Sequence, residues 1–373
     1  MRCIFTYLLL VFSLIGFSQN PVTIPIKNPP MPTTDTLRVL MIGNSFTYDA
    51  TEYIEEIVHY SGIDENTCCV YRVITEGGDQ LKDWRDRYRW KSIRSIEKVA
   101  GHLTMDITNG TLQELFHQNW DVISLQQLSR YSADISTYSP YLEDLLSYIY
   151  KDCINKNVAI CWHLPWSSWV EYATQDSAEY EGWLNIVSAT DEMIQKYGID
   201  IIIPSGTAIQ NARATKLNTE KSLTRDGHHM DLGIGRYIVA CTLYESLFEP
   251  VYGISIQNIL WHPNMITNTM ANLARECVSK AIDNWHDTTN LDNMTNNDEI
   301  TISPNPVTKY VFICNVSITN PVTCIIYDGM GRRIYKEKIL GYTYIDFSNY
   351  KRGIYTIQLK NGKTIKTQLI EKI

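Results

Sequence analysis

The chain has 373 residues, more than one small domain needs, which predicts a large domain with an accessory one. It carries 33 Lys and Arg residues against 41 Asp and Glu residues, a net charge of −8, without any basic run. This acidic balance argues against nucleic acid as a partner.

The first residues have the pattern of an export signal. Arg2 precedes an apolar stretch at residues 7–17 that is too short to span a bilayer, and polar residues follow. We predict a signal peptide at 1–19, a Pro- and Thr-rich leader at 20–35, and no transmembrane segment in the mature chain. Export permits disulfides, but Cys161 and Cys241 lie inside apolar runs, which favours buried free thiols.

Residues 36–286 alternate predicted strands and helices. Short apolar runs at 37–42, 69–74, 120–125, 158–162 and 199–203 predict five buried strands. Segments with helical spacing separate them, and two longer helices are predicted after the last strand. This alternation predicts an α/β fold with a doubly wound parallel sheet and helices on both faces. Such folds carry their chemistry at the carboxyl ends of the strands, so the strand exits are the candidate site.

A possible nucleophile follows the first strand directly. Ser45 stands on a Gly-Asn-Ser turn, and a serine hydroxyl needs a general base that a carboxylate orients. Asp226 and His229 lie three residues apart on a turn, so that the carboxylate can reach back to the ring. We interpret Ser45, His229 and Asp226 as nucleophile, base and orienting acid. The alternative is that Asn44 or Ser45 caps the next helix and Asp226 caps a turn.

A metal site is the weaker interpretation of the same region. His228, His229 and Asp231 are potential ligands, but neighbouring histidines rarely face one ion, and the sequence offers no other ligand cluster. We therefore predict neither a metal nor a cofactor.

Three sequence blocks, taken in order, resemble a known superfamily. Residues 43–47, a glycine after the second strand, and Asp226-x-x-His229 are similar to the blocks of SGNH (GDSL-like) hydrolases, over residues 36–286. The resemblance implies a flavodoxin-like α/β/α fold and a serine esterase that forms an acyl-enzyme. It implies that Ser45 attacks the ester carbonyl, with His229 as base and Asp226 as its partner. It also implies an oxyanion hole that combines the Ser45 backbone N–H, a glycine N–H and an Asn side chain.

The superfamily's third block, which supplies this Asn, departs from the pattern in the present chain. Gly78 is the expected glycine donor, with Gly77 as the turn residue, but Gly-x-Asn-Asp is absent and the third strand exit reads Gln126-Gln127. Losing an oxyanion donor costs about 3 to 4 kcal/mol, so we expect the amide of Gln126 or Gln127 to replace the Asn. Alternatively, these residues only bind the neighbouring loop.

Aromatic residues follow the fourth strand. We expect Trp162, His163 and Trp166 at the rim of the cleft, where flat rings suit sugars, although packing is the alternative. His163 is a second possible base, without a carboxylate at matching spacing. With the export signals, these rings predict O-acetyl groups on polysaccharide as the substrate. The alternatives are a lipase or thioesterase of the same family, or a non-catalytic surface glycan-binding protein on the same fold.

The last part of the chain predicts a separate domain. Residues 287–300 are rich in Asn, Thr and Asp and predict a linker, and alternating strands with an Asn361-Gly362 hairpin predict a small β-sandwich at 301–373. Cys314 and Cys324 could bridge within it. Segments 302–306, 327–332, 345–348 and 353–355 resemble the C-terminal sorting domain of the type IX secretion system of Bacteroidetes. That resemblance implies export through the periplasm and outer membrane by this machinery; a carbohydrate-binding module is the alternative.

Overall fold

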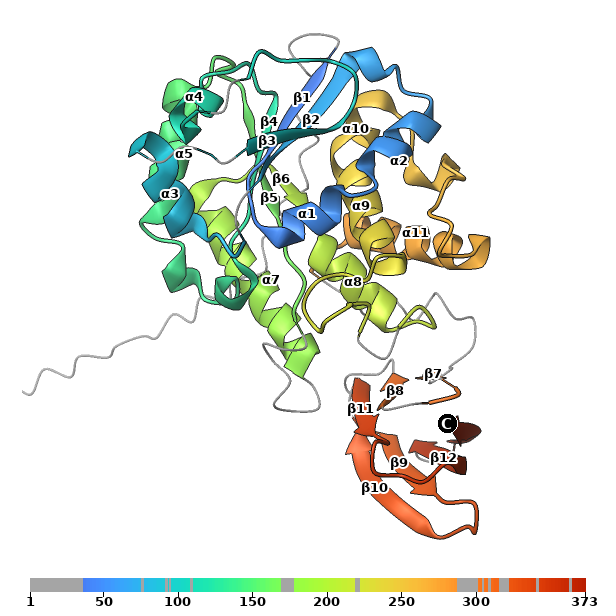
Figure 1. Ribbon diagram of the computed structural model, residues 1–373. Helices are drawn as coiled ribbons and strands as arrows, with labels where there is room; N and C mark the ends of the chain where they lie inside the picture. Colours follow the sequence, from blue (N-terminus) through green and yellow to red (C-terminus); the bar gives the residue numbers. More distant parts are fainter. Residues whose placement is uncertain are drawn as a thin grey trace, which may run out of the picture.

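The computed structural model describes residues 36–286 and 301–373. Short gaps fall at 75–76, 91–92, 94, 108–109, 169–177, 219–221, 304, 308–309, 315–321, 340–341 and 362–363. The predicted signal peptide, leader and linker, and the turn of the predicted hairpin, lie outside the described residues. Figure 1 shows a larger region of helices around a sheet and a smaller region of strands. In the described part of the chain, no helix combines the length and apolar character needed to cross a membrane.

A six-stranded sheet forms the centre of residues 36–286, with the strand order β3-β2-β1-β4-β5-β6. Along β2-β1-β4-β5-β6, each strand is parallel to its neighbour. This spatial order is that of flavodoxin-like sheets. This confirms the predicted fold class. The strands are β1 (Leu37–Met41), β2 (Cys68–Ile74), β3 (Ser95–Ala100), β4 (Val122–Leu125), β5 (Ala159–His163) and β6 (Ile201–Ile203).

The sheet separates two hydrophobic cores. Val39 and Met41 face one core and Leu40 and Ile42 the other, as the two-residue period of a strand requires. Helices α1, α2, α8, α9 and α11 contribute to the first core, and α3, α4, α5 and α7 to the second (Figure 1). The helices are α1 (Ser45–Thr51), α2 (Ile54–Ser61), α3 (Leu81–Trp90), α4 (Leu112–Phe116), α5 (Tyr141–Asp152), α7 (Ala178–Tyr197), α8 (Ser205–Arg213), α9 (Ile234–Leu247), α10 (Glu249–Tyr252) and α11 (Asn268–Asp283).

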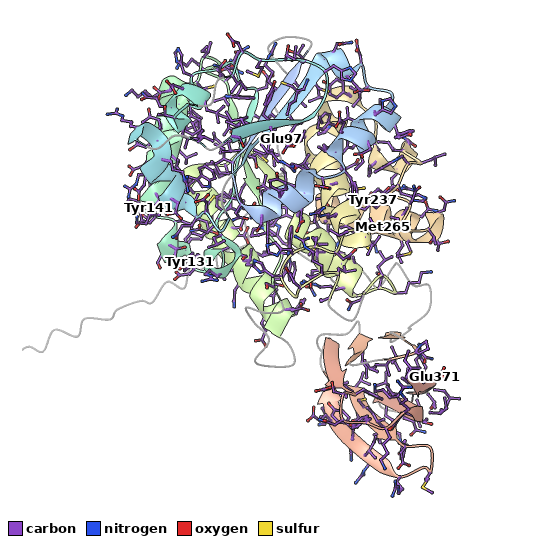
Figure 2. All side chains as sticks on the ribbon, in the orientation of Figure 1. Glu97, Tyr131, Tyr141, Tyr237, Met265 and Glu371 are labelled. Atoms are coloured by element: carbon purple, nitrogen blue, oxygen red, sulfur yellow. The ribbon has the colours of Figure 1, made fainter. Side chains whose placement is uncertain are left out.

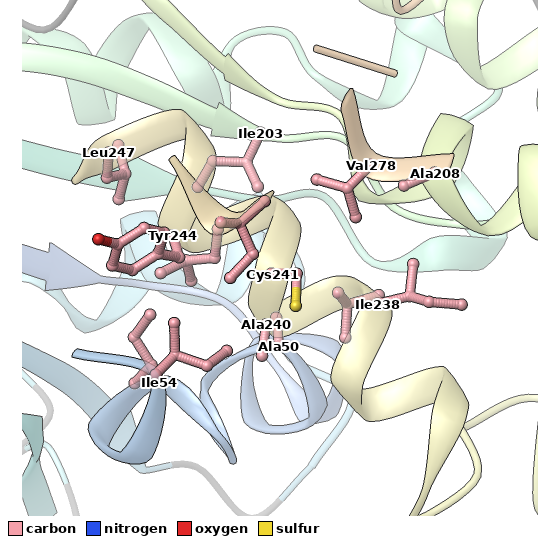
Figure 3. Packing of buried hydrophobic residues seen from close by; sticks show 14 of the residues in the cluster. Ala50, Ile54, Ile203, Ala208, Ile238, Ala240, Cys241, Tyr244, Leu247 and Val278 are labelled. Atoms are coloured by element: carbon pink, nitrogen blue, oxygen red, sulfur yellow. The ribbon is translucent and has the colours of Figure 1, made fainter. Parts of the chain in front are cut away.

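Helix α9 is the central element of the first core. It is buried on almost every side, and Figure 3 shows its Ile238, Cys241 and Tyr244 among side chains from α1, α2, β6, α8 and α11. Side chains fill the spaces between the sheet and the helices on both sides (Figure 2). Cys161 and Cys241 are buried free thiols, as predicted. Because α9 packs against α1, it fixes the segment before α9 relative to the first strand exit.

The structure corrects two parts of the predicted topology. Strand β3 lies at the edge of the sheet and is antiparallel to β2, so the sheet is mixed rather than wholly parallel. It was not predicted because its sequence, Ser-Ile-Glu-Lys-Val-Ala, has no continuous apolar run. Helix α8 follows β6 directly and comes in addition to the two longer helices predicted after the last strand. Its small residues pack closely: a Cβ on Gly206 would lie 2.3 Å from the Pro165 carbonyl oxygen.

Residues 301–373 form two antiparallel sheets around a core of their own. The orders are β10-β9-β12-β13 and β11-β8-β7, and buried residues of both sheets share one cluster, which confirms the predicted β-sandwich. Cys324 is a buried free thiol, which corrects the suggestion that it takes part in a bridge, and the side chain of Cys314 lies outside the described part of the structure. The strands are β7 (Thr301–Ser303), β8 (Tyr310–Cys314), β9 (Val322–Tyr327), β10 (Arg333–Ile339), β11 (Tyr342–Asp346), β12 (Gly353–Asn361) and β13 (Thr364–Lys372).

Candidate active site

The turn after β1 presents the Ser45 hydroxyl at the start of a helix. Asn44 caps α1: its backbone is extended, and its side-chain Oδ1 accepts a hydrogen bond of 3.0 Å from the Phe46 N–H. Ser45 is therefore the first helical residue, and its own N–H has no partner within the helix. Gly43 is required by close approach, since a Cβ there would lie 2.0 Å from Thr47 Oγ1. Asn44 thus caps the helix, as the alternative interpretation predicted. The cap does not involve the side chain of Ser45.

A short loop carries the histidine to this turn. Thr224 and Met230 form an antiparallel bridge, and the Arg225 N–H donates to the His229 carbonyl oxygen at 2.9 Å, so the loop between them closes on itself. Gly227 has φ = +85°, a left-handed conformation that glycine adopts without strain. The predicted turn therefore exists, and it carries the His229 ring to the Ser45 hydroxyl.

Ser45, His229 and Asp226 meet in a row. Ser45 Oγ lies 2.9 Å from His229 Nε2, and His229 Nδ1 lies 2.7 Å from Asp226 Oδ2. Asp226 Oδ1 also accepts the backbone N–H groups of His228, at 3.0 Å, and of His229, at 2.7 Å. An ionised Asp226 accepts a hydrogen bond from the Nδ1–H of His229, which leaves Nε2 unprotonated and able to take the serine proton.

The environment keeps Asp226 ionised. Partial burial by itself would raise the pKa of Asp226, but the hydrogen bonds from the His229 ring and from the two backbone N–H groups outweigh it and hold the pKa at about 2. The carboxylate is therefore charged at neutral pH, as an orienting partner for an imidazole must be.

An aspartate on α1 clamps the histidine loop to the helix that carries the serine. Asp49, whose side chain is 1% exposed, accepts from Arg225 Nη1 at 3.0 Å and from the Met230 N–H at 2.9 Å. Arg236, in the first turn of α9, donates to the same carboxylate at 2.8 Å. Because Arg225 and Met230 flank the loop on both sides, one buried charge fixes both of its ends relative to Ser45.

The two glutamines have structural partners. Gln127 is buried; its amide nitrogen donates to the Thr137 carbonyl and hydroxyl, and its oxygen accepts the Leu81 N–H. These contacts use both amide hydrogens, so Gln127 does not replace the third-block Asn. Gln126 is also buried, and its amide nitrogen donates to Asn44 Oδ1 at 3.1 Å, behind the turn that carries Ser45.

The segment that carries Gly77 and Gly78, here called the glycine loop, lies against the turn of Asn44 and Ser45. Asn44 Nδ2 donates to the Asp79 carbonyl oxygen at 3.2 Å, so the residue directly after Gly78 is tied to the residue directly before Ser45. Gly77 and Gly78 are exposed and have φ of +117° and +60°. Their backbone is thus bent in a way that favours glycine, next to the turn that carries the serine.

The aromatic residues after the fourth strand are not at a rim, which corrects our expectation. Trp162, His163 and Trp166 are fully buried, because β5 is an interior strand and the segment after it runs under the histidine loop. Trp166 stacks on Phe46 with ring centroids 3.8 Å apart and donates through Nε1 to the His228 carbonyl oxygen. Trp166 therefore supports the turn and the loop, whereas Trp162 lies in the second core beside Tyr138. We do not propose these aromatic residues as contacts for sugar.

His163 and His228 have partners other than the proposed nucleophile. His163 lies 2.9 Å from Ser205 Oγ and 3.1 Å from Gln126 Oε1, and complete burial lowers its pKa to about 3. It is therefore neutral and faces no carboxylate, so it does not serve as the alternative base. His228 Nδ1 lies 2.9 Å from Ser168 Oγ. The neighbouring histidine rings thus face different hydroxyl groups, Ser168 Oγ and Ser45 Oγ.

The sequence reasoning missed Asp49 and Arg225 as parts of the site. Asp49 lies one helical turn after Ser45, on the buried side of α1, where an unpaired carboxylate would be costly. Recognising that α1 must bury an aspartate would have indicated a cationic partner, and Arg225 directly precedes Asp226 in the sequence.

Comparisons with known proteins match both parts of the chain. A family model described as "Domain of unknown function (DUF4886)" matches residues 38–281, and "Secretion system C-terminal sorting domain" matches residues 301–372. A DUF4886 family protein from Bacteroides uniformis ATCC 8492, solved at 1.50 Å, is 29% identical; the match covers 69% of this chain and 99% of that one, with a TM-score of 0.60. A structure named as that of a GDSL-like lipase from Parabacteroides merdae ATCC 43184 is 17% identical. The match covers 58% of this chain and 98% of that one, with a TM-score of 0.40. No curated protein matches the chain.

Proposed function

The chain belongs to the DUF4886 family, and from the arrangement of its site we propose that it is a serine hydrolase that cleaves carboxylic esters. Its C-terminal region is a type IX secretion sorting domain, so the protein is exported to the cell surface or the medium, as the sequence predicted. The observation that carries the proposal is the row from Ser45 Oγ through the His229 ring to Asp226, with separations of 2.9 and 2.7 Å.

The proposed reaction has two halves. Ser45 Oγ attacks the ester carbonyl while its proton passes to His229 Nε2, and the alcohol leaves with that proton, so that an acyl-serine remains. Water then attacks the acyl-serine with His229 as base, which releases the acid and restores the serine. Asp226 stabilises the imidazolium in both halves. We propose the N–H groups of Ser45 and Gly78 as donors to the oxyanion, since Asn44 ties their two segments together.

The finer proposal concerns the substrate. We propose O-acetyl groups on polysaccharide, and support comes from the sorting domain, because an exported protein can meet polymers that are too large to enter the cell. The buried tryptophans no longer support it. Release of acetate from an acetylated polysaccharide, compared with hydrolysis of 4-nitrophenyl decanoate, tests this choice; a strong preference for the long acyl chain would move the proposal to a lipase.

The reaction type has a direct test. We expect a fluorophosphonate probe to label the wild-type protein and not Ser45→Ala, and we expect Ser45→Ala to lose turnover of 4-nitrophenyl acetate. Ser136→Ala is the matched control, because Ser136 bonds only within its own turn, to Asp134, and should keep both signals. Turnover that survives in Ser45→Ala would refute the mechanism. Absence of labelling in a folded wild-type protein that retains sugar binding would favour the glycan-binding alternative.

A further inference from the structure

A continuous chain of buried hydrogen bonds lies beneath the proposed nucleophile and is used by none of the catalytic steps. It runs from Ser205 through His163 to Gln126, and from there to Asn44. Every member is at least nine-tenths buried. The four residues come from α8 and from the exits of β5, β4 and β1, so the chain crosses three neighbouring strands of the sheet.

Two backbone groups determine the direction of every bond in this chain. The Phe46 N–H can only donate, so the Asn44 atom that faces it is an oxygen, and the Asp79 carbonyl can only accept, so the other Asn44 atom is nitrogen. Gln126 must then present its NH₂ to the Asn44 oxygen and its own oxygen to His163 Nδ1. A donor is needed on that ring nitrogen.

The remaining bonds agree with this direction. Gln126 Oε1 also accepts the Thr47 hydroxyl at 2.9 Å. With the proton on Nδ1, the neutral ring of His163 offers Nε2 as an acceptor, and Ser205 Oγ donates to it at 2.9 Å. Burial lowers the pKa of His163 to about 3, so the ring stays neutral at working pH. No buried donor or acceptor along the path is left facing a group of its own kind.

We propose that His163, held as the Nδ1–H tautomer, and Gln126 are positioning residues that orient Asn44 and thereby hold the glycine loop against the turn of Ser45. This inference rests on the proposed function, because the two segments that Asn44 joins carry the proposed oxyanion donors. It also gives a role to Gln126, which stands at the strand exit where the SGNH superfamily has its Asn. In this proposal Gln126 does not contact the oxyanion itself but acts through Asn44, from behind the proposed oxyanion hole.

A pair of substitutions of similar size tests the role of the ring proton. The amide nitrogen of His163→Asn can occupy the position of Nδ1 and donate to Gln126, whereas His163→Leu offers no donor. We expect His163→Asn to keep kcat within about threefold of wild type. We expect His163→Leu to lose about 10²-fold in kcat with KM little changed, as for a donor group displaced by about 1 Å. Equal kcat for the two folded variants would overturn the proposal.

Thr47 provides a second test if His163→Leu does not fold. Thr47→Val keeps the shape and removes the hydroxyl that fixes Gln126 Oε1, and Thr47→Ser keeps the hydroxyl. We expect about a tenfold loss of kcat in the valine variant and near wild-type kcat in the serine variant, in line with losing one of several supporting bonds. Identical values for the two variants would contradict the proposal.

The tautomer is measurable without any activity. In ¹⁵N NMR spectra of Ser45→Ala, we expect the His163 ring to show a protonated Nδ1 and an unprotonated Nε2; the opposite pattern would overturn the inference. The proposed function fails separately, if the wild-type protein shows no Ser45-dependent labelling by the fluorophosphonate. The two failures are therefore distinguishable.

Discussion

The clamp at Asp49 makes the most demanding prediction about how the site is held together. The carboxylate is 1% exposed and faces Arg225 at 3.0 Å and Arg236 at 2.8 Å, in addition to the Met230 N–H. Asp49→Asn keeps the shape and one acceptor oxygen but removes the charge that both guanidinium groups face. It therefore weakens the connection between α1 and the loop of His229 without touching a reacting atom.

The expected magnitude follows from the exposure of the partners. Removing one partner of a buried ion pair costs about 3 to 5 kcal/mol. Because Arg225 is 35% exposed and can regain water, we expect Asp49→Asn to lower the free energy of unfolding by about 2 to 3 kcal/mol. A displacement of the His229 ring by about 1 Å costs about 10²-fold in rate, so kcat should fall by about that factor.

Urea denaturation and turnover of 4-nitrophenyl acetate measure the two effects. Asp86→Asn is the matched control: Asp86 also faces two cations, Lys82 at 2.6 Å and Arg85 at 2.7 Å, but on the more exposed surface of α3. We expect this control to change stability by less than about 1 kcal/mol and to leave kcat unchanged. If Asp49→Asn matched the control in both measurements, the clamp would have no part in aligning the site.

Three further predictions concern the site and its support. Gly43→Ala should yield little soluble and active protein, because the added Cβ would lie 2.0 Å from Thr47 Oγ1. A variant with the solubility and kcat of the wild type would contradict this prediction. Asp226→Asn should lower kcat by about 10²- to 10⁴-fold in the ester assay, because the amide no longer stabilises the imidazolium of His229, and an unchanged kcat would exclude Asp226 as the orienting acid. The unfolded chain binds a proton at His163 below about pH 6.5, while the folded chain, with a pKa of about 3, does not. His163 therefore makes its full contribution to the free energy of unfolding above pH 6.5. Lowering the pH to 4.5 decreases the free energy of unfolding by about 3 kcal/mol. In urea titrations, the advantage of wild type over His163→Asn should shrink by that amount between pH 7.5 and 4.5; a constant difference would refute it.

Much of the architecture was predictable because it depends on local pattern. The five parallel strands are short apolar runs, and such runs need cover on both faces, which alternating helices provide. The proposal of Ser45 with Asp226 and His229 also came from local features, a strand exit and a turn of fixed spacing. The antiparallel edge strand and α8 were missed because a half-exposed strand and a helix of small residues show no apolar run or stripe.

The supporting residues were not predictable in the same way. Nothing near Trp166 in the sequence tells whether its ring faces solvent or lies under Phe46, since both arrangements follow the same strand exit. The glutamines are similar: Gln126 and Gln127 are adjacent, yet one supports Asn44 and the other binds Thr137. Adjacent residues at a strand end point to opposite sides, and the neighbours on each side come from distant segments.

The sequence by itself determined the five parallel strands and the alternation of strands and helices, the tail that directs export, and the three residue types that a nucleophilic ester cleavage needs. Only the tertiary structure decided that a serine at residue 45 and an imidazole 184 positions later lie within hydrogen-bond distance. The reason is physical: burial of α9 against α1, and of the Asp49 charge between two arginines, fixes the relative placement of segments that local preferences leave free.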